Sequence, residues 1–420
     1  MGEATEKARA AKRASAQVGL ASTEARNAAL ESMAQALRDH AADIVAANQQ
    51  DMEAARARGT KESLLDRLML DEKRVNAMAD ALVDLVNLPD PLGQVQVERE
   101  LYNGLQLKRV SVPLGVVAVV YEARPNVTAD AAGIALKAGN AVVLRGGSLA
   151  ERSNKAIADI LHEAAVSAGL PAGCIQCIES TDRSQTDELM SLHGVVDVLV
   201  PRGGAGLINH CVEHSKVPVI ETGTGNCHVY VHESADLAMA RDIVLNAKCR
   251  RYGVCNAAET LLVDASVADA FLPGVLADLA EKGVKLHCDD QAYRCAFAVE
   301  GADLEHATEE DWATEYLAPE IAVKCVGGVE EAISHVNEYG THHSEAIVAS
   351  DAAAQDLFAA QVDAAAVYVN ASTAFTDGGQ FGLGAEIGIS TQKLHVRGPF
   401  ALEALTSYKY VVRGEGQVRA

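Results

Sequence analysis

Aromatic side chains are scarce in this sequence: they make up 4% of its 420 residues and include one tryptophan. Hydrophobic residues nevertheless account for 49% and charged residues for 22%, so the chain is typical of a globular protein whose core is filled by alanine, valine and leucine. Basic residues are also few, 36 against 58 acidic ones, which gives a formal net charge of −22. We expect no nucleic-acid partner, because phosphate contacts need a basic face.

Long apolar runs are missing as well. The longest useful one extends from Leu114 to Tyr121, far short of the about 20 residues that a membrane-spanning helix needs. The first 20 residues carry charges throughout and contain no apolar segment of the kind found in signal peptides. We therefore expect a cytoplasmic protein without a membrane partner.

The nine cysteines are irregularly spaced, and their number is odd. In a chain of this kind the count indicates reduced thiols, most of them small core residues. Cys174 and Cys177 form a single CxxC pair with no second pair at zinc-finger spacing. A metal or redox role for this pair is an alternative, but packing is the better interpretation, and we expect no metal site.

The length predicts two or three domains. Apolar residues recur every three to four positions over residues 4–87, which predicts helices. Residues 94–115 alternate polar and apolar side chains around Asn103-Gly104, a strong hairpin signal. Buried strands then alternate with helices up to about residue 204, and a second alternation follows. Such alternation predicts α/β domains, the first with a doubly wound parallel sheet.

Ligands of such sheets bind in the turns after the strands. Arg145-Gly146-Gly147-Ser148 forms one such turn, and Arg202-Gly203-Gly204 forms another. Glycines between a strand and a helix expose backbone N–H groups to a phosphate, and an arginine adds a fixed charge. Each turn alone is more simply a tight connection; together they favour a nucleotide. Neither matches the GxGxxG fingerprint.

Cys255, in RYGVCNAAET, is a candidate nucleophile because Lys248, Arg250 and Arg251 lie just upstream and favour a thiolate. Asn256 and the small residues after it leave room for a substrate. From the pattern alone, Cys249 is hard to distinguish from Cys255.

Several stretches resemble the aldehyde dehydrogenase superfamily, and within it the glutamate-5-semialdehyde dehydrogenase family of proline biosynthesis. They include VPLGVVAVVYEARPNVTADAAGIALKAGNAVVLRGG, VPVIETGTGNCHVYV, NAKCRRYGVCNAAETLLV, HVNEYGTHHSEAI and FGLGAEIGISTQKLHVRGPFALEALTSYKYVVRGEGQVR. The resemblance covers essentially the whole chain. It implies an aldehyde dehydrogenase-like fold and an NADPH-dependent reduction of L-glutamyl 5-phosphate to L-glutamate 5-semialdehyde and phosphate.

The resemblance also implies the roles of individual residues. Cys255 attacks the acyl carbon and forms a thioester, while the amide of Asn126 and the backbone N–H of Cys255 bind the oxyanion. Glu320 holds the nicotinamide ribose. The two glycine turns complete the predicted cofactor site, through Arg145, Gly146, Gly147, Ser148, Gly203 and Gly204. Glu221, His343 and Ser344 are expected near the substrate, although loop packing explains the last two equally well.

Glu221 leaves a second function possible by the same resemblance, because it matches the superfamily glutamate that activates water for thioester hydrolysis. That role would make the protein a nonphosphorylating aldehyde dehydrogenase. A further alternative is a cofactor-binding protein without catalysis that serves as a scaffold, for example for γ-glutamyl kinase, but the presence of Cys255, Asn126 and Glu320 together speaks against it.

The expected domain organisation follows the same resemblance. Residues 1–93 and 116–229 would form the NADP-binding domain, and residues 230–375 the catalytic domain. Residues 94–115 and 395–420 would form a small oligomerisation element, because edge strands seek partners. We therefore expect a homo-oligomer that acts on a small-molecule substrate, with γ-glutamyl kinase considered as a further partner.

Overall fold

The computed structural model describes residues 2–419 and divides the chain into two compact units. The first unit holds the chain up to Thr222, then Gly382–Gly388 and the chain from Phe400 onward. The second unit holds Gly223–Phe381 and Ile389–Pro399. No helix among residues 2–419 is long and apolar enough to cross a membrane.

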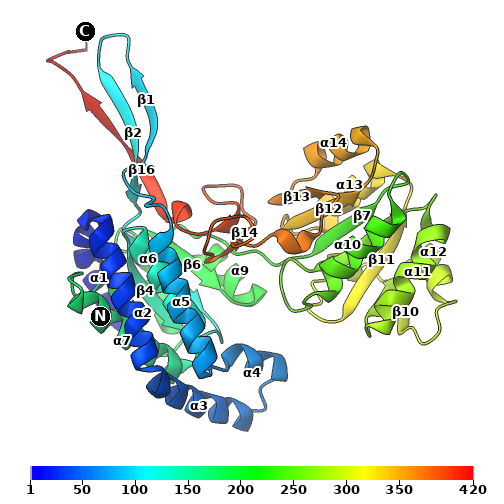
Figure 1. The fold of residues 1–420 in the computed structure, drawn as a ribbon, viewed down its shortest axis with the longest axis horizontal. Helices are drawn as coiled ribbons and strands as arrows, with labels where there is room; N and C mark the ends of the chain where they lie inside the picture. Colours follow the sequence, from blue (N-terminus) through cyan, green and yellow to red (C-terminus); the bar gives the residue numbers. More distant parts are fainter. Residues whose placement is uncertain (1, 420) are drawn as a thin grey trace. The chain divides into compact units, whose positions relative to one another are not determined.

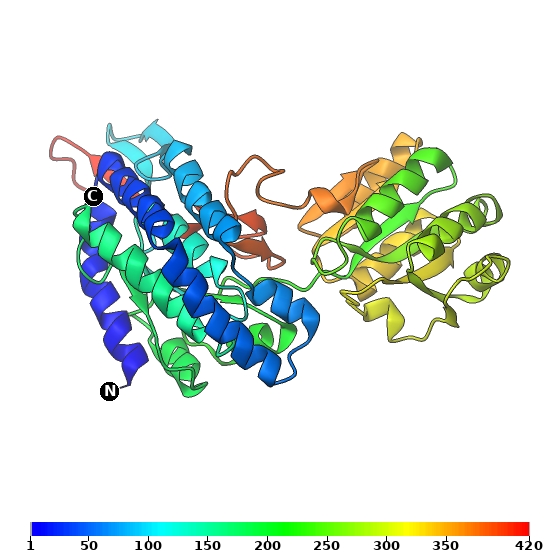
Figure 2. The ribbon, with the colours of Figure 1, turned by 60° about the horizontal axis from the view of Figure 1, so that its bottom comes forward.

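The first unit begins with five helices, as the apolar periodicity predicts. They are α1 (Glu3–Leu20), α2 (Thr23–Asp39), α3 (Ala41–Ala57), α4 (Glu62–Leu68) and α5 (Glu72–Asn87). Side-chain caps fix two of the helix starts: Ser22 Oγ accepts from the backbone N–H of Ala25, and Asp71 Oδ1 accepts from that of Arg74. Figure 2 shows α1, α2 and α3 in blue along this unit.

A four-stranded parallel sheet forms the core of the first unit. Its strands are β3 (Val116–Tyr121), β4 (Ala141–Gly146), β5 (Ile175–Cys177) and β6 (Val198–Arg202), in the order β5-β4-β3-β6. The intervening helices are α6 (Asn126–Lys137), α7 (Glu151–Ser167), α8 (Ser184–Ser191) and α9 (Ala205–His214). Strand order grows outward from β3 in both directions, so the doubly wound arrangement is confirmed. One face of β3, with Val116, Ala118 and Val120, packs on alanines of α1.

A separate three-stranded antiparallel sheet belongs to the same unit. It consists of β1 (Val95–Glu100), β2 (Gln106–Pro113) and β16 (Thr406–Arg413), with β2 in the centre. Gly104 has φ +81°, which a glycine adopts readily, so the predicted Asn103-Gly104 hairpin is confirmed. Figure 1 shows the three strands extending away from the helices of this unit.

The second unit is built on a seven-stranded parallel sheet. In spatial order its strands are β10 (Leu304–His306), β9 (Lys285–Cys288), β11 (Glu320–Val326), β8 (Ala258–Asp264), β7 (Cys227–Val231), β12 (Ser344–Val348) and β13 (Ala366–Val369). The sequence predicts all of them except β10, which has three residues and two exposed positions. The second α/β alternation is therefore confirmed.

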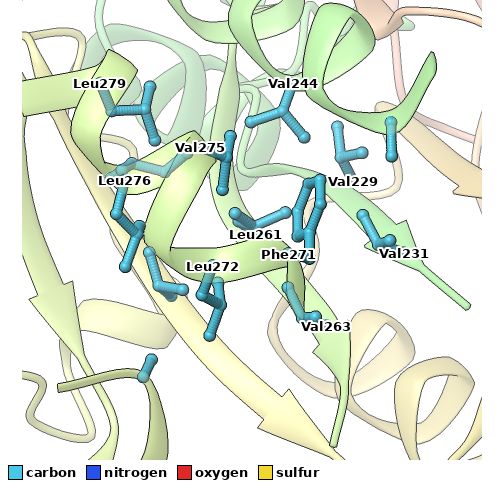
Figure 3. Packing of buried hydrophobic residues seen from close by; sticks show 14 of the residues in the cluster. Val229, Val231, Val244, Leu261, Val263, Phe271, Leu272, Val275, Leu276 and Leu279 are labelled. Carbon is cyan, nitrogen blue, oxygen red and sulfur yellow. The ribbon is translucent and has the colours of Figure 1, made fainter. Parts of the chain in front are cut away.

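Helices cover both faces of this sheet. The helices α10 (Leu237–Cys249), α11 (Ala268–Glu281) and α12 (Asp290–Ala296) pack on one face, and α13 (Val329–Tyr339) and α14 (Ala352–Gln361) pack on the other. Figure 3 shows Phe271, Leu272, Val275 and other α11 side chains directed at Val229, Leu261 and their strand neighbours. Because these strands are buried on both faces, their sequences are continuously apolar.

Short elements complete the structure: β14 (Gly388–Ser390) pairs with β15 (Gly398–Phe400), and three 3₁₀ turns lie at Asp311–Ala313, Thr373–Phe375 and Glu403–Leu405. Residues 223–229 and 395–399 belong to the second unit, whereas residues 94–115 and the chain from residue 400 onward belong to the first. The cofactor-binding and oligomerisation roles given to these ranges stay predictions.

Candidate functional site

Cys255 lies half-buried in the turn that joins α10 to β8. Its backbone carbonyl accepts a hydrogen bond from Cys227 Sγ at 3.2 Å. On the same side, a Cβ atom added to Gly225 would lie 1.5 Å from the carbonyl oxygen of Cys255. Only glycine permits this close approach, so residues 225–227 fix the backbone that carries the thiol.

Asn256 attaches the same turn to the segment after β13. Its side chain is buried, and Nδ2 donates to the carbonyl oxygens of Thr376 at 3.0 Å and Ala374 at 3.4 Å. In return, Thr373 Oγ1 donates to the carbonyl oxygen of Asn256 at 2.8 Å. The residue next to Cys255 is therefore fixed by three hydrogen bonds.

A fully buried ion pair links the two elements that flank the turn. Lys248 of α10 donates to Glu259 of β8 with a separation of 2.5 Å, and both side chains are 0% exposed. The other carboxylate oxygen of Glu259 accepts from the backbone N–H of Leu317 at 3.2 Å. Burial raises the pKa of Glu259 to about 7, against the lowering effect of Lys248. Lys248 is thus a structural partner of Glu259, which differs from its predicted role as a nearby charge.

Cys249 has surroundings that disfavour a thiolate. It is the last residue of α10 and is half-buried, and burial raises the pKa of its thiol despite Tyr252 and the nearby lysines. A raised thiol pKa lowers the fraction of nucleophile at neutral pH. Cys255, in its supported turn, stays the predicted nucleophile.

His343 and Ser344 are both 0% exposed. Ser344 Oγ contacts His343 Nδ1 at 2.8 Å and Thr376 Oγ1 at 2.6 Å, and His343 Nδ1 also lies 3.7 Å from Cys227 Sγ. Burial lowers the pKa of His343 to about 4, so its imidazole is neutral at physiological pH. These contacts connect both residues to Cys227 beneath the Cys255 turn, and a direct contact with substrate stays a prediction.

Glu320 begins β11, and its side chain remains 35% exposed. Its Oε2 atom lies 3.0 Å from Nε2 of His287, on the neighbouring strand β9. The carboxylate that the sequence assigns to the nicotinamide ribose is therefore oriented by a histidine while one side of it stays accessible.

Asn126 lies in the first unit, exposed at the start of α6. Its Nδ2 atom donates to Asp130 Oδ2 at 3.0 Å, one helical turn later. Burial raises the pKa of Asp130 to about 6. Asp130 thus orients the amide group that the sequence assigns to the oxyanion.

The turn after β4 borders a small cavity of about 60 Å³, lined by Gly146, Glu151, Asn154, Lys155, Cys177, Ile178, Glu179 and Thr181. Asn154 is 3% exposed, and its Oδ1 accepts from Thr128 Oγ1 at 3.2 Å, whereas its Nδ2 has no hydrogen-bond partner. A Cβ atom on Gly146 would lie 2.0 Å from that Nδ2. Glycine at 146 therefore leaves an unpaired buried donor beside the cavity, which fits an oxygen of a ribose or phosphate.

Arg145 lies beside this cavity but is already bonded. Its NH2 group donates to the carbonyl oxygens of Thr181 at 2.9 Å and Asp182 at 3.2 Å, while its Nε atom has no partner. Burial, with the nearby charge of Arg183, lowers its pKa. Ser148 is exposed in the following turn. The predicted cofactor turn thus carries one guanidinium, and Arg145 Nε in the turn and Asn154 Nδ2 on α7 both lack acceptors.

A carboxylate from the segment after β3 contacts the second glycine turn. Glu122 Oε2 accepts from the backbone N–H of Gly204 at 2.9 Å, at the start of α9. A Cβ atom on Gly203 would lie 2.7 Å from the same oxygen. A phosphate bound here would have to displace Glu122, so cofactor binding by Gly203 and Gly204 stays a prediction.

Glu221 lies half-buried in an irregular segment of the first unit.

Cys174 and Cys177 form the pair for which the sequence leaves a metal or redox role open. None of the nine cysteines forms a disulfide; Cys174 is buried and Cys177 half-buried, and burial raises the pKa of each thiol, to about 11 and about 12 respectively. Residues 2–419 contain no group of three or more histidine, cysteine, aspartate or glutamate side chains that could hold a metal ion.

Comparison with known proteins identifies the family. The model of the aldehyde dehydrogenase family matches residues 2–304. The chain belongs to the aldehyde dehydrogenase family. It is an oxidoreductase of that family, and the sequence-based assignment of its fold and family is confirmed.

Relatives that match nearly the whole chain share one name. The gamma-glutamyl phosphate reductase of Caldanaerobacter subterraneus is 52% identical over 414 residues, covering 98% of this chain and 99% of its own. That of Moorella thermoacetica is 55% identical over 398 residues, covering 94% of both chains. The crystal structure of gamma-glutamyl phosphate reductase from Thermotoga maritima is 46% identical, with a TM-score of 0.97 and full coverage of both chains. The resemblance to the glutamate-5-semialdehyde dehydrogenase branch is thereby confirmed.

The sequence missed the residues that hold the site residues in place. Cys227, Glu259, His287 and Asn154 each contact a predicted residue, or stand beside one, through the tertiary structure. Cys227 and Glu259 lie within the stretches that carry the resemblance, but nothing in those stretches distinguishes a supporting side chain from an ordinary core residue. For His287 and Asn154 the sequence offers no signal.

Proposed function

We propose that this enzyme reduces L-glutamyl 5-phosphate to L-glutamate 5-semialdehyde and phosphate with NADPH, through a thioester on Cys255, as a step of proline biosynthesis. The observation that carries the proposal is the turn between α10 and β8. It places a single half-buried cysteine on a backbone fixed by Gly225, Cys227 and Asn256, in a chain about half identical to proteins named gamma-glutamyl phosphate reductase.

The first step is acyl transfer to sulfur. The Cys255 thiolate attacks the acyl carbon, the C–S bond forms, and the bond to the phosphate oxygen breaks with its electron pair, so phosphate leaves. Charge develops on the carbonyl oxygen in the transition state, where preorganised donors lower the barrier. The backbone N–H of Cys255 is the donor we propose from the second unit. Asp130 orients the amide of Asn126 in the first unit, and the role of that amide as a second donor stays a prediction from the resemblance.

NADPH, when bound, supplies the hydride that reduces the thioester carbonyl. The chain's own residues fit such a group: Asn154 offers an unpaired buried donor, and Arg145 adds positive charge beside the cavity after β4. Glu320 keeps an accessible carboxylate for ribose hydroxyls. The preference for NADPH over NADH rests on Arg145, since a guanidinium suits a 2′-phosphate.

Glu221 favours a second function, hydrolysis of the thioester by water in a nonphosphorylating aldehyde dehydrogenase. A glutamate that accepts a proton from water would serve that reaction. We place Glu221 instead near the substrate or as a brace for its turn, because phosphate is the acyl acceptor when the proposed reaction runs backward.

The test runs the reaction backward, because the acyl phosphate is unstable. Purified protein receives glutamate 5-semialdehyde and NADP⁺, with and without phosphate, and the absorbance of reduced nicotinamide is followed. Reduction that requires phosphate supports the phosphorylating reductase. Equal reduction without phosphate would assign the thioester to water and Glu221, and no reduction in either case would exclude both functions.

We also propose that the enzyme is a homo-oligomer assembled through the three-stranded sheet. β1 and β16 are its two edge strands, and Tyr408, Tyr410 and Val412 of β16 are each about half exposed. Alternating exposed apolar residues on an edge strand favour pairing with a second copy. Light scattering on the wild type and on Tyr410→Arg tests this: a monomeric wild type would contradict it. The partnership with γ-glutamyl kinase stays a prediction.

A further inference from the structure

His287 has both ring nitrogens directed at carboxylates. Its Nε2 lies 3.0 Å from Glu320 Oε2, and its Nδ1 lies 3.3 Å from Asp311 Oδ1. The Nε2 contact is a hydrogen bond, and the Nδ1 contact is an approach within ion-pair distance. The side chain is 8% exposed, so these two contacts decide its orientation.

Further contacts hold the ring in this position. Tyr316 stacks on it with 5.0 Å between ring centroids and 13° between planes, and the Tyr316 hydroxyl donates to Asp311 Oδ1 at 2.8 Å. The other oxygen of Asp311 accepts from the backbone N–H of Thr308 at 2.6 Å and from its hydroxyl at 2.8 Å. Asp311 is therefore saturated with donors, and these hydrogen bonds together with His287 lower its pKa.

Glu320 differs from Asp311 in one respect. Its carboxylate is 35% exposed, whereas that of Asp311 is 15% exposed. One histidine thus joins a buried, saturated carboxylate to an accessible one. An accessible carboxylate on a long side chain has many rotamers, and a charge-assisted hydrogen bond restricts them before a ligand arrives.

We propose that His287 is a positioning residue for Glu320, holding its carboxylate in the orientation that binds the ribose hydroxyls of the nicotinamide cofactor. This inference rests on the proposed function, because it takes Glu320 as the ribose ligand. Asp311 and Tyr316 act one step further away, by fixing the ring of His287. Loss of His287 frees the Glu320 side chain and weakens cofactor binding without removing the ligand itself.

The test measures NADPH affinity by the change in nicotinamide fluorescence on binding, so it does not depend on turnover. The variants are His287→Gln, Glu320→Gln and the double variant. Losing a hydrogen bond to a charged group weakens binding by about 3- to 30-fold when the remaining contacts keep part of its effect. We expect His287→Gln to raise the Kd of NADPH by about 3- to 10-fold, Glu320→Gln to raise it further, and the double variant to match Glu320→Gln.

His306→Gln is the matched control. His306 lies on the adjacent strand β10, is 61% exposed and also faces a carboxylate, Asp290 at 3.6 Å, but it does not contact Glu320. Its Kd for NADPH should equal that of the wild type. Asp311→Asn is a second variant, expected to weaken binding in the same direction as His287→Gln but by less.

The split between KM and kcat adds a readout that a merely structural role would not change. In the phosphate-dependent assay, His287→Gln should raise the KM for NADP⁺ by a larger factor than it lowers kcat. Besides Asp311 and Glu320, the groups facing the ring are Glu305 Oε2, 4.0 Å from Nδ1, and the Tyr316 hydroxyl. Lys285, 3.0 Å from Glu305, neutralises that third carboxylate.

The outcomes separate the inference from the proposed function. An unchanged Kd in His287→Gln, or a double variant whose effect is the product of the single effects, overturns the positioning role. Wild-type protein that binds NADPH but shows no phosphate-dependent reaction overturns the proposed reaction and leaves the positioning role to the binding data. If His287→Gln fails to fold, Asp311→Asn decides: an unchanged Kd there also overturns the role.

Discussion

The buried pair of Lys248 and Glu259 gives the sharpest prediction of this structure. Both side chains are 0% exposed, and the pair joins the last turn of α10 to the first residues of β8, on either side of Cys255. Replacing Lys248 by methionine keeps the volume but leaves the carboxylate of Glu259 without its cation. Breaking a buried pair in this way costs about 3–5 kcal/mol, because a charge stays buried without compensation.

The loss should depend on pH in a defined direction. Burial already raises the pKa of Glu259 to about 7 with Lys248 present, so removing the lysine raises the pKa further. A folded-state pKa above the unfolded value means that the folded state binds the proton more tightly, and stability then falls as the pH rises from the unfolded pKa through the folded one. Lys248→Met should therefore be destabilised more at pH 8 than at pH 5.5.

The assay is the melting temperature of the second unit, followed by calorimetry at both pH values. For a unit of this size a change of 1 kcal/mol shifts the melting temperature by about 2–4 °C, so the loss corresponds to about 6–20 °C. The double variant Lys248→Met, Glu259→Leu removes both charges and should recover most of the loss, since an apolar pair needs no counter-charge. A double variant no more stable than Lys248→Met, or a loss that does not grow with pH, would refute the reasoning.

Three further predictions concern the site residues. Gly225→Ala should abolish activity and lower the melting temperature, because its Cβ would lie 1.5 Å from the carbonyl oxygen of Cys255, whereas Gly274→Ala in α11, where a Cβ meets nothing within 4 Å, should be tolerated or slightly stabilising. Cys255→Ser should abolish phosphate-dependent reduction of NADP⁺, and Cys249→Ser should retain most of it; equal rates for the two variants would contradict the assignment. Asp130→Asn should raise the melting temperature more at pH 8 than at pH 5, because the raised pKa of about 6 makes the ionised side chain unfavourable in the folded state.

The sequence predicts most of this fold because the signals are local. Continuous apolar strands such as Val116–Tyr121 and the glycines that follow α6, α7 and α11 mark the α/β alternation, and Asn103-Gly104 marks the hairpin. What it leaves open depends on contacts between distant segments. Leu304–His306 pairs with β9 through its backbone, and nothing in its composition distinguishes this edge strand from a loop.

The candidate site divides in the same way. Cys255 is predictable because its residue type and neighbours carry the chemistry. His287 is not, because its role depends on a carboxylate 33 positions later and another 24 positions later, which β9, η1 and β11 bring together. Cys227 likewise contacts the Cys255 carbonyl only because β7 and β8 are neighbours in the sheet. Residues that act through another residue leave no pattern of their own.

Support of Cys255 from separate parts of the chain has a consequence for interpreting variants. Residues 225–227, the pair of Lys248 and Glu259, and residues 373–376 each fix the turn by a different contact. A change at any of them moves the sulfur without altering the nucleophile, and a misplacement of about 1 Å costs about 10²-fold in rate. Loss of activity in such a variant is therefore no sign of a catalytic role. The rate of Cys255 alkylation distinguishes the cases, because a displaced thiol still reacts with a small reagent, whereas Cys255→Ser has no thiol to label at that position.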